Sequence, residues 1–246
     1  MVIHLHLGFH KTGSTSLQAL LRANRGRLPA RFGAVAQGDA ALAPLEAACR
    51  AFDARPDVAR GQAVTAAARA LAAIMAGSGQ PEWLVSSEDL LGRIPSPRDA
   101  AQIYARAPQL LALLQDAFGA VQATVYLRDH GPWVDSLYRH LLRTRGLRMT
   151  GARLAALPKF APGCLEAAAG RLPAVATLRF EDDLDGPPGP GRGFLRAAGL
   201  TATEIAALAP VARQNPGIRS AEVARMERPV MLLLPQRLRK ALIRKG

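Results

Sequence analysis

The chain has 246 residues, of which 49% are hydrophobic and 21% are charged, a composition that excludes a fibrous or wholly disordered protein. Its 32 Lys and Arg residues outnumber its 19 Asp and Glu residues, so the net charge is +13. This charge favours anionic partners without distinguishing a nucleotide from a nucleic acid, an acidic glycan or a membrane. The length suits one domain with a sizeable core, and we expect residues 1–246 to form a single domain.

Few residues suggest a disulfide, a metal site or a membrane segment. Cys49 and Cys164 are too few for a disulfide scaffold and lack the spacing of metal ligands. His4 and His6 alternate along an apolar stretch without a third ligand, so we interpret them as sheet-face residues and expect no metal. That stretch is too short for a signal peptide, and no apolar run approaches the ~20 residues of a membrane helix. These features favour a cytoplasmic protein, and the richness in Ala and Arg suggests a bacterial genome rich in GC.

The predicted elements alternate between short strands and helices. Apolar runs predict strands at residues 2–7, 83–86, 121–127 and 175–180. Helical periodicity predicts helices over residues 14–24, 41–76 with a break near 55–56, 101–118, 131–145, 193–199, 202–212 and 217–244. The alternation predicts an α/β fold of three layers, in which helices flank a mostly parallel central sheet. Ligands bind such folds where the strands end, which directs attention to the segments after the first three strands.

The segment after the first strand has the residues of an anion site. It reads Gly8-Phe9-His10-Lys11-Thr12-Gly13-Ser14-Thr15-Ser16. A strand that leads through a glycine-containing turn into a helix directs backbone N–H groups and the helix dipole at an anion. The hydroxyls of residues 14–16 add donors, and Lys11 adds a positive charge. The ATP-binding pattern G-x-x-x-x-G-K-[ST] is not matched, because this lysine lies inside the turn instead of at the start of the helix.

This segment resembles the 5′-phosphosulfate loop of the sulfotransferases that use 3′-phosphoadenosine 5′-phosphosulfate (PAPS). In that family K-[ST]-G-[ST]-[TS] directly follows the first strand. The resemblance implies a sulfotransferase fold similar to that of the P-loop NTPases, with Lys11 as a catalytic residue that neutralises charge on the leaving 5′-phosphate. It also implies that the 5′-phosphosulfate is bound by His10, Lys11, Thr12, Gly13, Ser14, Thr15 and Ser16.

A second motif follows the third predicted strand. The same family binds the 3′-phosphate of the nucleotide with an arginine at the end of a later strand and a serine eight residues further on, and Arg128 and Ser136 have this spacing. Independently of the family, arginine offers a planar fork of donors to a phosphate, and Ser136 is expected about one turn into the next helix. The alternative is that Arg128 pairs with Asp129 or Asp135 and that Ser136 is an ordinary surface residue.

A candidate general base follows the second predicted strand. Transfer of a sulfuryl group to a hydroxyl or amine requires removal of the acceptor proton. Members of the family use a His or a Glu, in some of them just after this strand, and Glu88 is the first candidate by position. Asp89 could face the site instead, because the register at the end of a strand is uncertain. His10, His130 and His140 are further candidates, and the alternative for Glu88 is a carboxylate that caps a helix or pairs with an arginine.

The C-terminal residues 217–246 form a basic tail in the sequence, predicted to be helical. A basic amphipathic helix can lie on an anionic membrane, so peripheral contact with the inner membrane is one interpretation, and a helix packed on the domain with a solvated basic face is the other. Arg213 or Arg219 could close on the 3′-phosphate. No nucleic-acid-binding motif accompanies the charge, so we do not expect a nucleic acid as partner.

These motifs predict a cytoplasmic bacterial sulfotransferase. It would transfer the sulfuryl group of PAPS to a hydroxyl, or less readily an amine, of a small-molecule or glycan acceptor and release 3′-phosphoadenosine 5′-phosphate (PAP). The family needs no metal. The alternatives are a P-loop nucleotide kinase or NTPase, and a non-enzymatic protein that binds polyanions or membranes through its basic tail.

Overall fold

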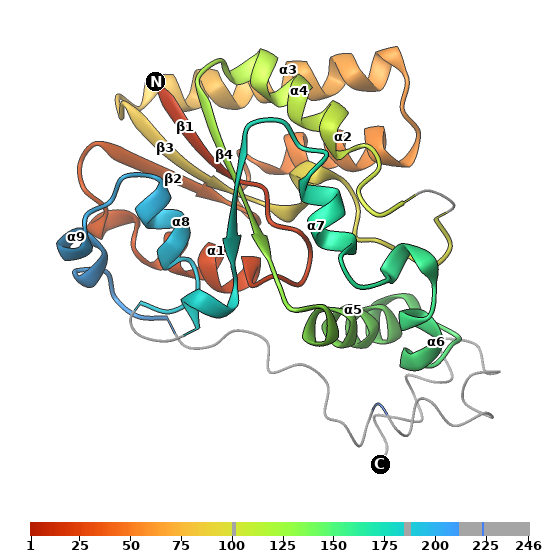
Figure 1. The fold of residues 1–246 in the computed structure, drawn as a ribbon. Helices are drawn as coiled ribbons and strands as arrows, with labels where there is room; N and C mark the ends of the chain where they lie inside the picture. The colour runs from red at the N-terminus through yellow and green to blue at the C-terminus, as the bar shows by residue number, and fades with distance from the viewer. Residues whose placement is uncertain (100–101, 185–187, 212–222, 224–246) are drawn as a thin grey trace, which may run out of the picture.

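The computed structural model describes residues 1–99, 102–184, 188–211 and 223 (Figure 1). Five parallel strands form one sheet in the order β2-β3-β1-β4-β5. The strands are β1 (Val2–His6), β2 (Phe32–Ala36), β3 (Glu82–Ser86), β4 (Val121–Leu127) and β5 (Val175–Arg179). The predicted α/β class with a parallel central sheet is therefore confirmed.

Helices and short helical turns connect the strands. The helices are α1 (Ser14–Ala23), α2 (Ala43–Ala54), α3 (Val58–Gly77), α4 (Ala107–Phe118), α5 (His130–Arg145), α6 (Gly151–Ala155), α7 (Cys164–Ala169), α8 (Arg192–Ala197) and α9 (Ala202–Ala206). Single 3₁₀ turns are η1 (Arg25–Arg27), η2 (Glu88–Leu91), η3 (Pro158–Phe160) and η4 (Glu181–Asp183). The predicted break between the two Ala-rich helices lies at residues 55–57, as expected.

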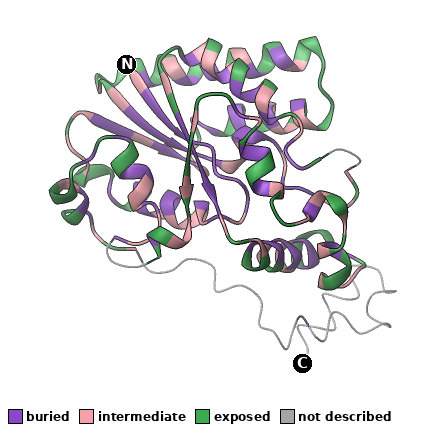
Figure 2. Cartoon of the chain, in the orientation of Figure 1, coloured by how far each residue is buried: buried purple, intermediate pink, exposed green. Residues whose placement is uncertain are grey.

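Two hydrophobic cores lie on opposite faces of the sheet, because successive side chains of a strand point to opposite faces. Ile3 and Leu5 of β1 belong to the larger core, which α2, α3, α4, α5 and α7 cover. The smaller core on the other face contains side chains of α1, α8 and α9 together with Leu84 and Tyr126. Figure 2 shows the buried strands between these helical layers, and the arrangement is the expected one of three layers.

His4 and His6 lie buried on the face of the smaller core, as the sequence analysis expects. The His4 Nε2 atom lies 2.9 Å from the Glu82 carboxylate, and the His6 Nδ1 atom lies 2.8 Å from the Ser86 hydroxyl. Burial lowers the pKa of His6 to about 3, so its imidazole is neutral at pH 7. Among the described residues, no three His, Cys, Asp or Glu side chains form a group that could hold a metal ion.

Strand β2 is absent from the sequence prediction. Its sequence, Phe32 to Ala36, contains a glycine and two alanines, which are uncommon in strands. Packing explains the glycine, because a Cβ atom on Gly33 would lie 2.6 Å from the Trp83 ring of the neighbouring strand β3. The strand thus depends on a tertiary contact that the local sequence does not reveal.

Two predicted helix boundaries are wrong. Helix α4 begins at Ala107, not at residue 101: Pro108 lies in its first turn, and Tyr104 has a left-handed backbone with φ 53°. Helix α9 ends at Ala206 instead of residue 212, because the ring of Pro210 would clash with the helical carbonyl four residues earlier.

No helix in the described part of the chain combines the length and the apolar character needed to cross a membrane. The predicted helix at residues 217–244 and the candidates Arg213 and Arg219 fall outside the described residues, apart from Val223.

Candidate functional site

The three segments selected from the sequence meet at the carboxyl edge of the sheet. Strand β1 lies between β3 and β4, so the segments that follow these strands are neighbours. A guanidinium N–H of Arg128 donates to the Lys11 carbonyl at 2.8 Å, and the charges of Glu88 and Lys11 act on each other. The structure therefore brings Lys11, Glu88 and Arg128 together.

The loop from Gly8 to Gly13 alternates between anchored and open positions. Phe9 is fully buried in the larger core, and the Thr12 hydroxyl donates to the Phe9 carbonyl at 2.6 Å. Between them Lys11 is only half-buried, and its φ of 73° is unusual for a residue with a side chain. Such backbone strain persists only where the surroundings hold it, and it concentrates at functional sites.

Donors at the end of this loop lack protein acceptors. Within the described part of the chain, the backbone N–H groups of Gly13, Ser14 and Thr15 donate to no protein atom. The Ser14 hydroxyl is buried and also has no hydrogen-bond partner among the described residues. Buried polar groups are normally paired, so these donors mark a place that suits an anion. Thr15 and Ser16 are half-buried in the same first turn of α1.

Both glycines of the loop are required by close contacts. A Cβ atom on Gly8 would lie 2.3 Å from the Ser14 hydroxyl and 2.7 Å from the His6 ring. Gly13 has a left-handed φ of 93°, and a Cβ atom there would lie 2.3 Å from the Phe180 ring. Phe180 is predicted only as the last residue of a strand, but its ring packs directly against the loop.

Hydrogen bonds from distant elements fix the loop backbone. The Tyr104 hydroxyl accepts from the His10 N–H at 2.7 Å, and the Trp133 indole donates to the His10 carbonyl at 2.9 Å. Arg128 completes this set through the Lys11 carbonyl. The sequence analysis does not identify Tyr104 and Trp133 as residues that hold the loop. The signal that could have found them is that buried Tyr and Trp side chains usually form a hydrogen bond through their polar group.

Lys11 lies among charged groups. Burial lowers the pKa of its ammonium group, Glu88 opposes that change, and Arg143 and Arg128 lower the pKa further. The Glu88 carboxylate accepts a hydrogen bond of 2.6 Å from the Gln18 side chain of α1, which holds it on the loop side of the sheet edge. A carboxylate and an ammonium group thus share one site.

Asp89, the alternative to Glu88, is held by other partners. It pairs with Arg50, accepts from the Gln37 side chain at 3.1 Å and lies 3.5 Å from the His10 ring. Burial acts to raise the pKa of Asp89, but His10 and Arg50 outweigh burial and lower it. Glu88 is therefore the acid that faces Lys11.

The three histidines differ in how far they are engaged. His10 has its Nδ1 atom 3.2 Å from the Tyr104 hydroxyl in addition to its Asp89 contact. The His130 ring lies 2.7 Å from the Phe160 carbonyl and donates to it. His140 is half-buried, and burial together with the charges of Lys11 and Arg143 lowers its pKa to about 4, so it is neutral at pH 7.

The two aspartates suggested as alternative partners of Arg128 have other partners. Asp129 pairs with Arg179, and Asp135 pairs with Arg139 at 2.7 Å. The Arg128 guanidinium instead lies over the Phe180 ring, 4.9 Å from its centroid.

Ser136 lies deeper in its helix than predicted. Helix α5 begins at His130, so Ser136 is nearly two turns in, instead of about one. The unpaired N–H groups of a helix start lie in its first turn, so Ser136 offers only its half-buried hydroxyl.

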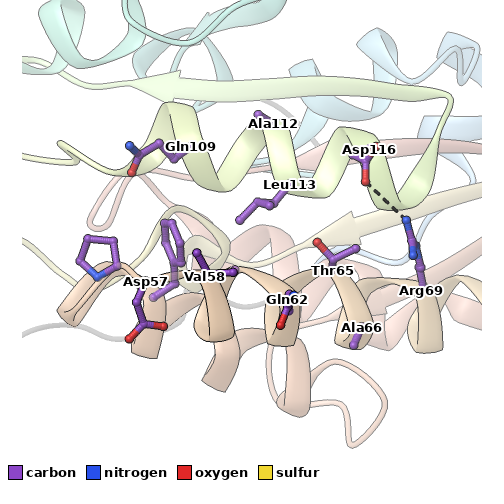
Figure 3. Close-up of a pocket in the computed structure, with 13 residues that line it drawn as sticks. Asp57, Val58, Gln62, Thr65, Ala66, Arg69, Gln109, Ala112, Leu113 and Asp116 are labelled. Atoms are coloured by element: carbon purple, nitrogen blue, oxygen red, sulfur yellow. Dashed lines mark hydrogen bonds and ion pairs between the residues drawn. The ribbon is translucent and has the colours of Figure 1, made fainter.

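A groove of about 920 Å³ lies elsewhere on the molecule (Figure 3). Its lining residues come from α2, α3, α4 and the α2–α3 connection, and an ion pair between Arg69 and Asp116 crosses it. The groove is mostly apolar and does not include the loop after β1, so we do not assign it to the candidate site.

Comparisons with protein-family models, with curated proteins and with solved structures found no match.

Two hydroxyls of the loop should respond differently to removal. Ser14→Ala should change the free energy of unfolding by less than about 0.5 kcal/mol and weaken the binding of pyrophosphate about tenfold, because this hydroxyl has no hydrogen bond to any described residue that could be lost. Thr12→Val is the matched control and should cost about 0.5–1.5 kcal/mol, because it loses the bond to the Phe9 carbonyl. Urea unfolding and titration calorimetry measure both effects. Equal destabilisation by the two changes, with unchanged pyrophosphate affinity in Ser14→Ala, would assign Ser14 to the fold.

Proposed function

We propose that this protein is a PAPS-dependent sulfotransferase, which transfers the sulfuryl group of PAPS to a hydroxyl, or less readily an amine, of an acceptor. The observation that carries the proposal is the loop after β1, where three backbone N–H groups and the buried Ser14 hydroxyl have no acceptor among the described residues. Lys11 belongs to the same loop and lies two residues before Gly13. This donor set fits a phosphate that carries a transferable group.

The 5′-phosphate of the nucleotide would lie at the start of α1. Backbone N–H groups from Gly13 to Thr15, the hydroxyls of Ser14, Thr15 and Ser16, and the helix dipole stabilise its negative charge. Thr12 and His10 contribute differently from the expectation: the Thr12 hydroxyl and the His10 backbone are engaged within the protein, so they shape the loop.

The 3′-phosphate would lie between Arg128 and Ser136. A guanidinium is a planar fork of donors that suits a phosphate, and that of Arg128 donates to the Lys11 carbonyl and lies over the Phe180 ring. The same arginine therefore connects the two ends of the nucleotide site.

The reaction would proceed in line at sulfur. The acceptor oxygen forms a bond to sulfur while the bond between sulfur and the bridging oxygen breaks, and PAP leaves with that oxygen on its 5′-phosphate. Lys11 would neutralise the charge that builds up on the leaving oxygen. The acceptor proton passes to Glu88, which faces the same space as Lys11. Positioning and electrostatic stabilisation supply the rate enhancement.

The position of the lysine separates this proposal from a nucleotide kinase or NTPase. In the ATP-binding pattern the lysine starts the helix, whereas Lys11 precedes Gly13, the residue that caps α1. Tight binding of ATP with Mg²⁺, without binding of PAP, would favour the kinase or NTPase. A cytoplasmic location and a membrane contact of the tail remain predictions from the sequence.

Removal of the lysine should slow turnover strongly without unfolding the protein. Lys11→Ala is expected to lower the rate of sulfuryl transfer by about 10²–10³-fold, because one charge on the leaving oxygen is no longer neutralised. The assay follows labelled PAPS with a panel of hydroxyl acceptors. Arg27→Ala, which removes an exposed cation of η1, serves as the control and should keep full activity. Near wild-type turnover in Lys11→Ala would refute the mechanism.

The 3′-phosphate assignment predicts a selective loss of affinity. Ser136→Ala and Arg128→Ala should weaken PAP binding, the arginine change by about 10–100-fold, because a charge-assisted contact is lost. Adenosine 5′-phosphate lacks the 3′-phosphate, so its affinity should be unchanged in Ser136→Ala. Titration calorimetry with both nucleotides provides the comparison. An unchanged PAP affinity in Arg128→Ala would remove the assignment.

The base assignment predicts an effect on turnover alone. Glu88→Gln keeps an acceptor for the Gln18 side chain, so the fold and the PAP affinity should be preserved while kcat falls by about 10²–10⁴-fold. Asp89→Asn is the companion variant. Its kcat should stay within a few-fold of the wild-type value, because Asp89 is not the residue that takes the acceptor proton. Full activity of Glu88→Gln would transfer the role to another residue.

A further inference from the structure

One row of side chains on helix α5 lies on the side of the helix that faces the loop after β1. The Trp133 indole donates to the His10 carbonyl, which fixes the side of α5 that faces the loop. His140 lies seven residues further along, so it stands two turns away on the same line of the helix. Ser136 lies three residues after Trp133 and Arg143 three residues after His140, so each is a surface neighbour of the residue that it follows.

Charge at this edge is dominated by cations. The charges of Arg143 and Arg128 both lower the pKa of Lys11, and the charges of Lys11 and Arg143 both lower the pKa of His140. Glu88 is the acid that opposes them at Lys11. Arg143 is exposed, and among the described residues no carboxylate lies within ion-pair distance of it.

The proposed reaction uses two of these cations and leaves the third without a role. Lys11 serves the leaving 5′-phosphate, and Arg128 with Ser136 serves the 3′-phosphate. Polar side chains near Lys11 and Glu88 include Gln18, which donates to Glu88, and His140 and Arg143, which interact electrostatically with Lys11. Polar neighbours suit a hydroxyl-rich acceptor, and an arginine in this position suits an oxyanion on it.

We propose that Arg143, with His140 beside it on α5, forms an anion subsite for the acceptor, so that the preferred acceptor is a hydroxyl compound that carries a carboxylate. This inference rests on the proposed function. Arg143 binds the carboxylate through its planar fork, His140 contributes a hydrogen bond, and the acceptor hydroxyl is directed towards Lys11 and Glu88.

A matched pair of sugars tests the subsite without turnover. Methyl β-glucuronide and methyl β-glucoside differ only in a carboxylate in place of a hydroxymethyl group. NMR titration of the PAP-loaded protein should show at least about tenfold tighter binding of the glucuronide. Arg143→Gln should abolish this preference and leave the PAP affinity unchanged. Arg153→Gln, which removes an exposed arginine of α6, should keep both.

Each other outcome overturns the inference in a distinguishable way. Equal affinities for the two sugars, no binding of either, or a preference that survives in Arg143→Gln would refute the acceptor subsite while PAP binding still supports the proposed function. A weaker PAP affinity in Arg143→Gln would assign Arg143 to the nucleotide instead. Failure of the wild-type protein to bind PAP would overturn the proposed function, and the subsite with it.

Discussion

The site depends on hydrogen bonds that hold the loop after β1 from outside. Tyr104, Trp133 and Arg128 bind the backbone of His10 and Lys11 from three different parts of the chain. With its carbonyls and N–H groups engaged there, the loop keeps the left-handed turn at Lys11 and leaves the donors of Gly13 to Thr15 without acceptors in the part of the chain that the structure describes. Packing and hydrogen bonds thus fix one side of the loop, and the donors on the other side are those that we propose to bind an anion.

Local signals were sufficient for most of the fold and for selecting the segments that meet at the candidate site. Strand β4 follows its predicted bounds, and the order of strand, turn and helix around Lys11 follows from residue types alone. Tertiary contacts explain what could not be predicted. Gly33 lies in a strand because the Trp83 ring covers it, and Phe180 belongs to the site because it fills the space beside Gly13. Neither contact can be predicted from hydrophobic periodicity, because periodicity is evaluated within one segment of the sequence at a time.

Some of the basic side chains that give the chain its net positive charge are engaged in ion pairs. Several arginines are neutralised in the structure: Arg179 by Asp129, Arg139 by Asp135 and Arg50 by Asp89. Because each of these aspartates is engaged in an ion pair, it is not the partner of a cation at the candidate site. The positive charge at the carboxyl edge of the sheet therefore comes from a few side chains, Lys11 and Arg143 among them, instead of from a general excess.

The bond between Trp133 and His10 couples the loop to α5 energetically. A ligand that binds only the ordered loop stabilises every element whose order the loop requires. Amide hydrogens of α5, more than a hundred residues away in the sequence, should then exchange with solvent more slowly when an anion occupies the loop. Because the same helix carries His140 and Arg143, binding at the start of α1 would also order the side chains that we propose to bind the acceptor.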